Sequence, residues 1–157
     1  MPAKPQSTPR VSRRLASLSL SLLGAIAAFA PWAGAGEPRP FRVIVHRDNP
    51  LSAAPREFLG DVFLKRVTRW SDDETIKPVD LRADSPTRKK FSEQIVGRSV
   101  AAVRSYWQQR IFSGRGVPPP ELESEEAVIE YVSKHRHAIG YVSGAAELGA
   151  TKELTIR

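Results

Sequence analysis

The sequence contains no cysteine among its 157 residues. A chain without cysteine forms no disulfide bond, has no thiol nucleophile and offers no site for lipid attachment after an export signal. We therefore expect a domain that is stabilised by its own apolar core rather than by cross-links.

The sequence also lacks common catalytic and nucleotide-binding motifs. It has no Gly-x-Ser-x-Gly segment, which presents a nucleophilic serine, and no Gly-x-x-x-x-Gly-Lys segment, which holds nucleotide phosphates. Its acid pairs, Asp72 with Asp73 and Glu125 with Glu126, fall in an expected loop and at an expected helix start, where solvated charge is the ordinary interpretation. We expect a protein that is not an enzyme and uses no cofactor.

Residues 1–35 have the pattern of an export signal. A basic start without acids precedes an apolar run over residues 15–30, and residues 33–35 are the small residues Ala-Gly-Ala, which suit a cleavage site. The cations of the basic start are Lys4, Arg10, Arg13 and Arg14. The pattern predicts a signal peptide cleaved after Ala35 and a mature periplasmic domain over residues 36–157.

Two alternatives for this segment stay open. Residues 15–32 approach the roughly 18 to 20 residues that a membrane-spanning helix needs, so an uncleaved inner-membrane anchor is the competing interpretation. Serines, Gly24 and Pro31 make the run less apolar and favour cleavage. The arginine pair at residues 13–14 leaves twin-arginine export open beside general secretion.

The net charge of +7 belongs largely to this export signal. The signal takes four of the 24 basic residues and none of the 17 acidic ones, which leaves the predicted mature domain with a net charge of +3. A charge this small argues against nucleic acid as a partner.

Beyond the signal, strand patterns alternate with helix patterns. Runs of β-branched and aromatic residues indicate strands, and apolar residues three and four positions apart indicate helices. We predict strands at residues 41–45, 76–81, 138–142 and 153–156, the last at a sheet edge, and helices at residues 55–66, 86–96, 100–113 and 123–135. This order predicts one α/β domain with a mixed, partly parallel sheet flanked by helices.

The stretch at residues 79–91 combines features of an anion site. A buried strand is expected to stop at Arg82, and the next helix to begin with Ser85 as its cap and Pro86 at its first position. Three cations follow in the first turn, at residues 88–90, although the positive end of the helix dipole disfavours them there. Hydroxyls and free N–H groups at a helix start can accept an oxyanion. The candidate ligands are Arg82, Ser85, Thr87 and Arg88, with simple helix capping by the hydroxyls as the alternative.

Tryptophan and histidine give weaker indications. Trp107 lies on the apolar stripe Val100, Val103, Trp107 and Ile111 of its predicted helix, and Trp70 ends a helix-to-strand connection, so both are expected to be buried rather than to stack on a ligand. His135 and His137 fall across a helix-to-strand boundary, and spacing places no third ligand such as His46 beside them. We expect no metal site.

Three segments resemble one known family. Residues 63–70 (Phe-Leu-Lys-Arg-Val-Thr-Arg-Trp) are similar to the aromatic-x-Gly-Lys-x-x-x-Trp segment of phosphate-type periplasmic solute-binding proteins. Residues 82–87 (Arg-Ala-Asp-Ser-Pro-Thr) resemble the Arg-x-Asp-Gly-Ser-Gly-Thr anion loop of that family, and residues 137–142 (His-Ala-Ile-Gly-Tyr-Val) resemble its Gly-Ala-Ile-Gly-Tyr-Val strand. The three segments occur in the family order, over most of residues 41–142.

The resemblance implies one lobe of a two-lobed binding protein (type II, in a single-lobe short form). In the family, the arginine, serine and threonine of the loop bind phosphate oxygens, which carries over to Arg82, Ser85 and Thr87. The loop here is one residue shorter and lacks both glycines, so its backbone is less able to approach an oxyanion closely.

Two functions follow from this resemblance. The first is a phosphate ABC transporter substrate-binding-like protein that binds phosphate or a related oxyanion and uses a second surface, from a homodimer or a transporter or sensor component. The second is a periplasmic interaction or accessory module that has kept the fold and lost the ligand.

Overall fold

The structure is a computed structural model and describes residues 39–157. A mixed five-stranded sheet lies at the centre of this part of the chain. The predicted signal peptide, its cleavage site and the alternative anchor at residues 15–32 lie outside the described residues. No helix within residues 39–157 has the length and apolar character needed to cross a membrane.

The sheet has the strand order β2-β7-β1-β6-β3. The strands are β1 (Phe41–His46), β2 (Ala53–Ala54), β3 (Lys77–Pro78), β6 (Ala138–Ser143) and β7 (Thr151–Ile156). β1 runs antiparallel to both β6 and β7, while β2 is parallel to β7 and β3 is parallel to β6. The predicted mixed, partly parallel sheet is therefore confirmed.

The sequence predicts the last strand at an edge of the sheet, and this prediction is wrong. β7 pairs with β1 on one side and with the two-residue strand β2 on the other. A strand as short as β2 carries no period of its own, so the sequence pattern did not reveal it.

All four predicted helices are present, but the first ends at Phe63 rather than at residue 66 and the last begins at Glu125 rather than at residue 123. They are α1 (Arg56–Phe63), α2 (Pro86–Phe91), the π-helical continuation η1 (Ser92–Val96), α3 (Val100–Phe112) and α4 (Glu125–Lys134). Ser85, Ser99 and Ser124 each accept a hydrogen bond from the N–H group three residues on, and Gly97 and Gly114 follow their helices with φ of 69° and 66°.

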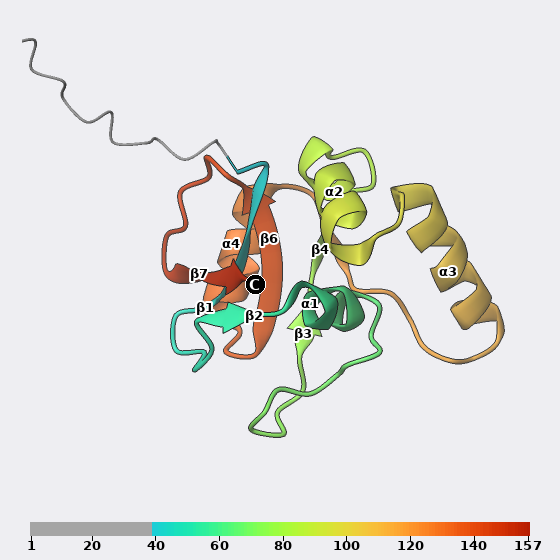
Figure 1. Ribbon diagram of the computed structural model, residues 1–157, viewed down its shortest axis with the longest axis horizontal. Helices are drawn as coiled ribbons and strands as arrows, with labels where there is room; N and C mark the ends of the chain where they lie inside the picture. Colours follow the sequence, from blue (N-terminus) through green and yellow to red (C-terminus); the bar gives the residue numbers. More distant parts are fainter. Residues whose placement is uncertain (1–38) are drawn as a thin grey trace, which may run out of the picture. The chain divides into compact units, whose positions relative to one another are not determined.

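α4 packs against β1 and β6, whereas α3 contacts η1 and the end of α1 and stands apart from the sheet (Figure 1). The close approach of α4 to β6 depends on Gly140, because a Cβ there would lie 2.6 Å from Cγ1 of Val128. Aromatic rings join α1, α2 and β6 in the core, where Phe91 stacks on Tyr141 with ring centroids 3.8 Å apart and Phe63 meets both edge-on.

The predicted strand at residues 76–81 is two short strands rather than one. β3 pairs with β6 in the main sheet, and β4 (Asp80–Leu81) pairs with β5 (Glu121–Leu122) in a separate parallel pair. The change occurs between Val79, whose N–H donates to Ile139, and Asp80, whose N–H donates to Pro120. The chain thus leaves the sheet just before α2, which brings Asp80 next to the residues that follow α3.

Trp70 and Trp107 are both buried, as expected, with exposures of 6% and 5% respectively. Trp70 belongs to the main core, where its indole N–H donates to the carbonyl of His137. The apolar stripe predicted for α3 is wrong at its last member, because half of the Ile111 surface is exposed. α3 contacts the rest of the domain over a narrow area, so only Val103 and Trp107 of this helix are buried.

Candidate functional site

The candidate anion site lies where β4 ends and α2 begins, as the sequence predicts. The chain turns after Leu81, and the N–H of Ser85 closes the turn on the carbonyl of Arg82 at 3.1 Å. Ser85 then caps α2, with its Oγ accepting from the N–H of Arg88 at 3.3 Å, and Pro86 occupies the first helical position. Local sequence determines this turn because a cap and a proline both favour a helix start.

Arg82 lies at the surface between two carboxylates. Its Nη1 donates to Glu123 at 3.0 Å and its Nη2 to Asp84 at 3.1 Å, and these hydrogen bonds, with Glu123 first, raise the pKa of the guanidinium. Arg82, Ser85 and Pro86 line an open hollow of about 360 Å³ together with the same two acids. An anion in this hollow would meet the arginine and the serine, but also the carboxylates that already neutralise the arginine.

Thr87 is turned away from that hollow toward α4. Its side chain is largely buried, and its hydroxyl donates to Glu125 Oε1 at 2.7 Å. The other oxygen of Glu125 accepts from the hydroxyl of Ser143 in β6, also at 2.7 Å. A carboxylate of the chain itself therefore accepts the hydrogen bond that the resemblance assigns to a phosphate oxygen.

Arg88 is buried in an ion-pair cluster of its own. Only 4% of its surface is exposed, and its Nη1 lies 2.8 Å from Asp80 Oδ1 and 3.4 Å from Glu121 Oε1, while it also donates to the carbonyl of Leu81. The hydroxyl of Tyr141 donates to Asp80 from the other side. Burial raises the pKa of Asp80 to about 6, although Arg88 and Tyr141 oppose the shift, and burial followed by the charge of Asp80 raises the pKa of Tyr141.

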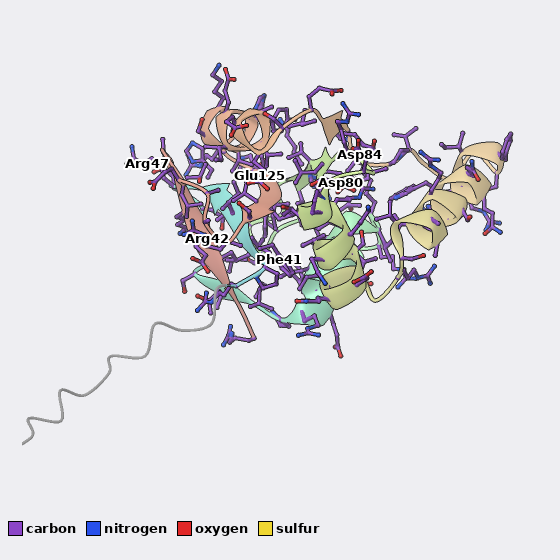
Figure 2. All side chains as sticks on the ribbon, turned by 90° about the horizontal axis from the view of Figure 1, so that it is seen from above. Phe41, Arg42, Arg47, Asp80, Asp84 and Glu125 are labelled. Atoms are coloured by element: carbon purple, nitrogen blue, oxygen red, sulfur yellow. The ribbon has the colours of Figure 1, made fainter. Side chains whose placement is uncertain are left out.

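The four predicted ligands therefore form two groups. Arg82 and Ser85 share the open hollow, whereas Thr87 and Arg88 lie in the interior and bind carboxylates of neighbouring elements. Figure 2 shows three of the carboxylates, Asp80, Asp84 and Glu125, around the start of α2. The start of α2 is thus a charge-compensated cluster rather than a bare cationic pocket.

Sequence reasoning missed the carboxylates of this cluster. One signal was available at Asp80, an acid between two apolar residues of a predicted buried strand, since buried acids are paired. Glu121, Glu123 and Glu125 gave no comparable signal, because acids near a helix start are commonly solvated.

The histidines occupy separate places. His135 contacts the carbonyl of Tyr131 through Nδ1 at 2.7 Å, while His137 Nε2 lies 3.8 Å from Glu74. Within residues 39–157, no three His, Asp or Glu side chains are grouped so that they could hold a metal ion.

The architecture is that of one lobe of phosphate-type periplasmic binding proteins. A Clostridium perfringens structure described as a phosphate ABC transporter substrate-binding protein with bound phosphate matches 75% of this chain with a TM-score of 0.61 and 20% identity. An ABC-type phosphate transport receptor from Vibrio cholerae matches 75% with a TM-score of 0.58 and 21% identity, and PstS from Borrelia burgdorferi matches 76% with a TM-score of 0.57 and 14% identity.

These matches establish the fold that the sequence motifs had indicated. The chain spans less than half the length of the three structures, 45%, 46% and 47% respectively. No protein-family model matches the sequence, and no curated protein matches it significantly. The similarity is therefore one of fold, over one lobe.

Proposed function

We propose that this chain is an exported phosphate transporter substrate-binding-like protein that takes phosphate or a related oxyanion at the start of α2. The observation that carries the proposal is the open hollow that Arg82 and the helix cap Ser85 line, in a fold shared with a protein crystallised with bound phosphate. The proposal has no chemical step: the protein binds and hands over its ligand.

Binding in the hollow would combine one charge with hydrogen bonds. Arg82 can form charge-assisted hydrogen bonds to an oxyanion, and the hydroxyl of Ser85 can donate while its lone pair keeps capping α2. Pro86 has no N–H, so the first free helical donor is that of Thr87. Asp84 and Glu123 compete with the ligand for Arg82, so we expect weak binding that depends on displacing Glu123.

Thermal unfolding with added phosphate or sulfate tests the proposal. A saturable rise in the melting temperature is expected, because a ligand that binds only the folded state stabilises it, and sodium chloride at the same ionic strength is the control. Arg82→Ala should abolish the rise. Ser99 provides a matched control for Ser85, because it caps α3 with the same hydrogen bond, 3.2 Å from the N–H of Ala102. Ser85→Ala should lose the anion response and Ser99→Ala should keep it.

The carboxylates offer a test in the opposite direction. Glu123→Gln keeps an acceptor near Arg82 and removes a negative charge, so it should strengthen the response to phosphate, as should Glu125→Gln beside Thr87. Equal responses of the wild type and both variants would contradict a site at the start of α2.

The second candidate is an accessory interaction module that keeps the fold without a ligand. The observation that favours it is the internal pairing of Thr87 with Glu125 and of Arg88 with Asp80, which leaves these two groups fewer bonds for an anion. Calorimetry that detects no phosphate, sulfate or arsenate binding by the wild type or by Glu123→Gln favours this candidate.

Export and assembly are part of the same proposal. We infer a periplasmic protein that is released after Ala35, which the mass of the protein recovered from a periplasmic extract tests; retention of the full chain in the membrane fraction favours the anchor at residues 15–32. Because the hollow is open to solvent, we expect a second surface, from another copy or from a transporter or sensor component, to increase affinity. Light scattering with and without phosphate tests the homodimer.

A further inference from the structure

The end of α3 and the loop after it form an unusual surface. Within residues 39–157, the large hydrophobic residues with high exposure are Ile111 at 50%, Phe112 at 90% and Val117 at 64%, and all three lie here. We call these residues, with the pocket described next, the α3 surface. Clustered exposed apolar side chains on a soluble domain commonly mark a place of interaction.

A pocket of about 150 Å³ opens beside these residues, between α3 and the proline-rich loop. Its apolar wall consists of Val100, Trp107, Ile111, Pro118 and Pro119. Its charged lining residues are Arg104 and the ion-pair cluster of Arg88 with Asp80 and Glu121. The volume suits one bulky apolar side chain rather than a larger ligand. Pockets that accept a single anchoring side chain are typical of the energetic centre of protein interfaces.

The charge that α3 and the loop after it contribute to this region has one sign. Residues 97–120 contain the four arginines Arg98, Arg104, Arg110 and Arg115 and no acid. Within the described residues none of these arginines forms a salt bridge, unlike Arg82 and Arg88. The two acids that line the pocket, Asp80 and Glu121, already pair with Arg88. The exposed Arg104, which lines the pocket, and the exposed Arg115 therefore keep positive charge available to a partner of negative charge.

α3 is held in place well enough to present this surface. The hydroxyl of Tyr106 donates to the carbonyl of Leu64 at 3.0 Å, and the guanidinium groups of Arg66, Arg98 and Arg110 lie 5.5 to 6.0 Å from its ring centroid. These contacts hold α3 in place, because Tyr106 joins it to the residue that follows α1.

We propose that the α3 surface docks an acidic segment of a partner protein, with one bulky apolar side chain of that segment in the pocket. The pocket selects the apolar anchor and the arginines select its acidic surroundings. A second copy of this chain is a poorer occupant, because a symmetric contact through this surface would bring arginines against arginines. The proposal goes beyond oxyanion binding and does not depend on it.

The direct test titrates the ¹⁵N-labelled protein with short synthetic peptides. The probe is a peptide of glutamates around one central phenylalanine, and its controls carry a central alanine or lysines in place of the glutamates. Trp107 provides the reporter, because it lines the pocket, and Trp70 is the internal control, because its indole N–H is bound to His137 in the core. We expect the indole signal of Trp107 to shift with the acidic phenylalanine peptide while that of Trp70 stays unchanged.

Surface variants locate the binding. Phe112→Ser and Arg104→Glu should each weaken binding of the acidic phenylalanine peptide about tenfold or more, since loss of a central contact commonly costs this much. Arg47→Glu is the matched control, because Arg47 is also exposed and lies at the far end of the described part from α3 (Figure 2).

Each remaining outcome overturns the proposal. An unchanged Trp107 signal at saturating peptide, equal binding of the alanine and phenylalanine peptides, or equal binding by Arg104→Glu and Arg47→Glu excludes docking at this surface. Phosphatidylglycerol vesicles form a separate arm: if the protein sediments with them through Phe112 while no peptide binds, the surface recognises lipid and not a protein.

Discussion

Two arginine-rich regions of this chain differ in what surrounds their charge. At the start of α2, Arg82 and Arg88 each lie within salt-bridge distance of two carboxylates. On the α3 surface, four arginines occur over residues 97–120 without an acid between them and without a salt bridge within the described residues. The arginines in the segment that resembles an anion loop are thus already paired with carboxylates. Those of residues 97–120, which resemble no motif, keep their positive charge available to a partner.

The comparison shows that cations indicate an anion site only when the acids that fold against them are known. The acids at the start of α2 come from β4, β5, the loop before α4 and α4 itself. α3 stands apart from the sheet (Figure 1). The two acids that line the pocket next to it, Asp80 and Glu121, pair with Arg88 rather than with the arginines of α3. The predictions below test this difference, from the largest effect to the smallest.

Arg88→Leu should produce the largest loss of stability. It leaves Asp80 buried without its cation, and breaking a buried pair in this way typically costs about 3 to 5 kcal/mol of unfolding free energy. Urea unfolding at neutral pH measures the loss, and Arg104→Leu on the α3 surface should change stability by less than about 0.5 kcal/mol. Similar losses for the two variants would show that the regions do not differ.

The pH dependence of stability should report Asp80. Its pKa is about 6 in the folded state against an ordinary value of 3.8, so the folded protein binds the proton more tightly. The stability that the protonated form contributes is therefore lost as the pH rises from 3.8 through about 6, by about 3 kcal/mol in all. The groups that face Asp80 are Arg88, Glu121 and Tyr141. Urea unfolding of the wild type and Asp80→Asn at pH values across the window measures the difference, and a constant difference would falsify the shift.

Much of the fold could be predicted from the sequence because its signals are local. Ser85 with Pro86, Ser99, Gly97 and Gly114 mark helix ends through the conformation of one or two residues, and the structure has helix ends at each. The strand at residues 138–142 could be predicted equally well, because a short continuous apolar run is typical of a strand that is buried on both faces. This signal can be recognised without knowing the neighbouring strands.

The candidate site could be predicted only in part, because its other half depends on contacts between distant segments. Thr87 and Glu125 are 38 residues apart, and nothing near either residue specifies that they meet. The division of residues 76–81 between two sheets likewise depends on β5, a two-residue strand after three prolines. Exposure of Ile111 followed from the narrow contact of α3, which helical periodicity does not reveal.

The caps of α2 and α3 should be equal in stability although their regions differ in function. Ser85→Ala and Ser99→Ala each remove one side-chain acceptor at a helix start, which costs about 1 kcal/mol. Chemical denaturation measures both losses. A much larger loss for Ser85→Ala would show that Ser85 supports the buried cluster as well as the cap, and its anion response could then not be separated from folding.

Phe112→Ser should have the smallest effect on stability, less than about 0.5 kcal/mol, because 90% of the side chain is already in contact with water. The matched residue in the other region is Phe91 of α2, which is 1% exposed and stacks on Tyr141, so Phe91→Ala should cost about 3 to 5 kcal/mol. Both are measured by urea unfolding. If Phe112→Ser destabilised the fold by a similar amount, Phe112 would belong to the packing of α3 and would not be free to contact a partner. An unchanged stability together with weaker peptide binding separates the two uses of phenylalanine in this chain: Phe91 holds the core and Phe112 serves recognition.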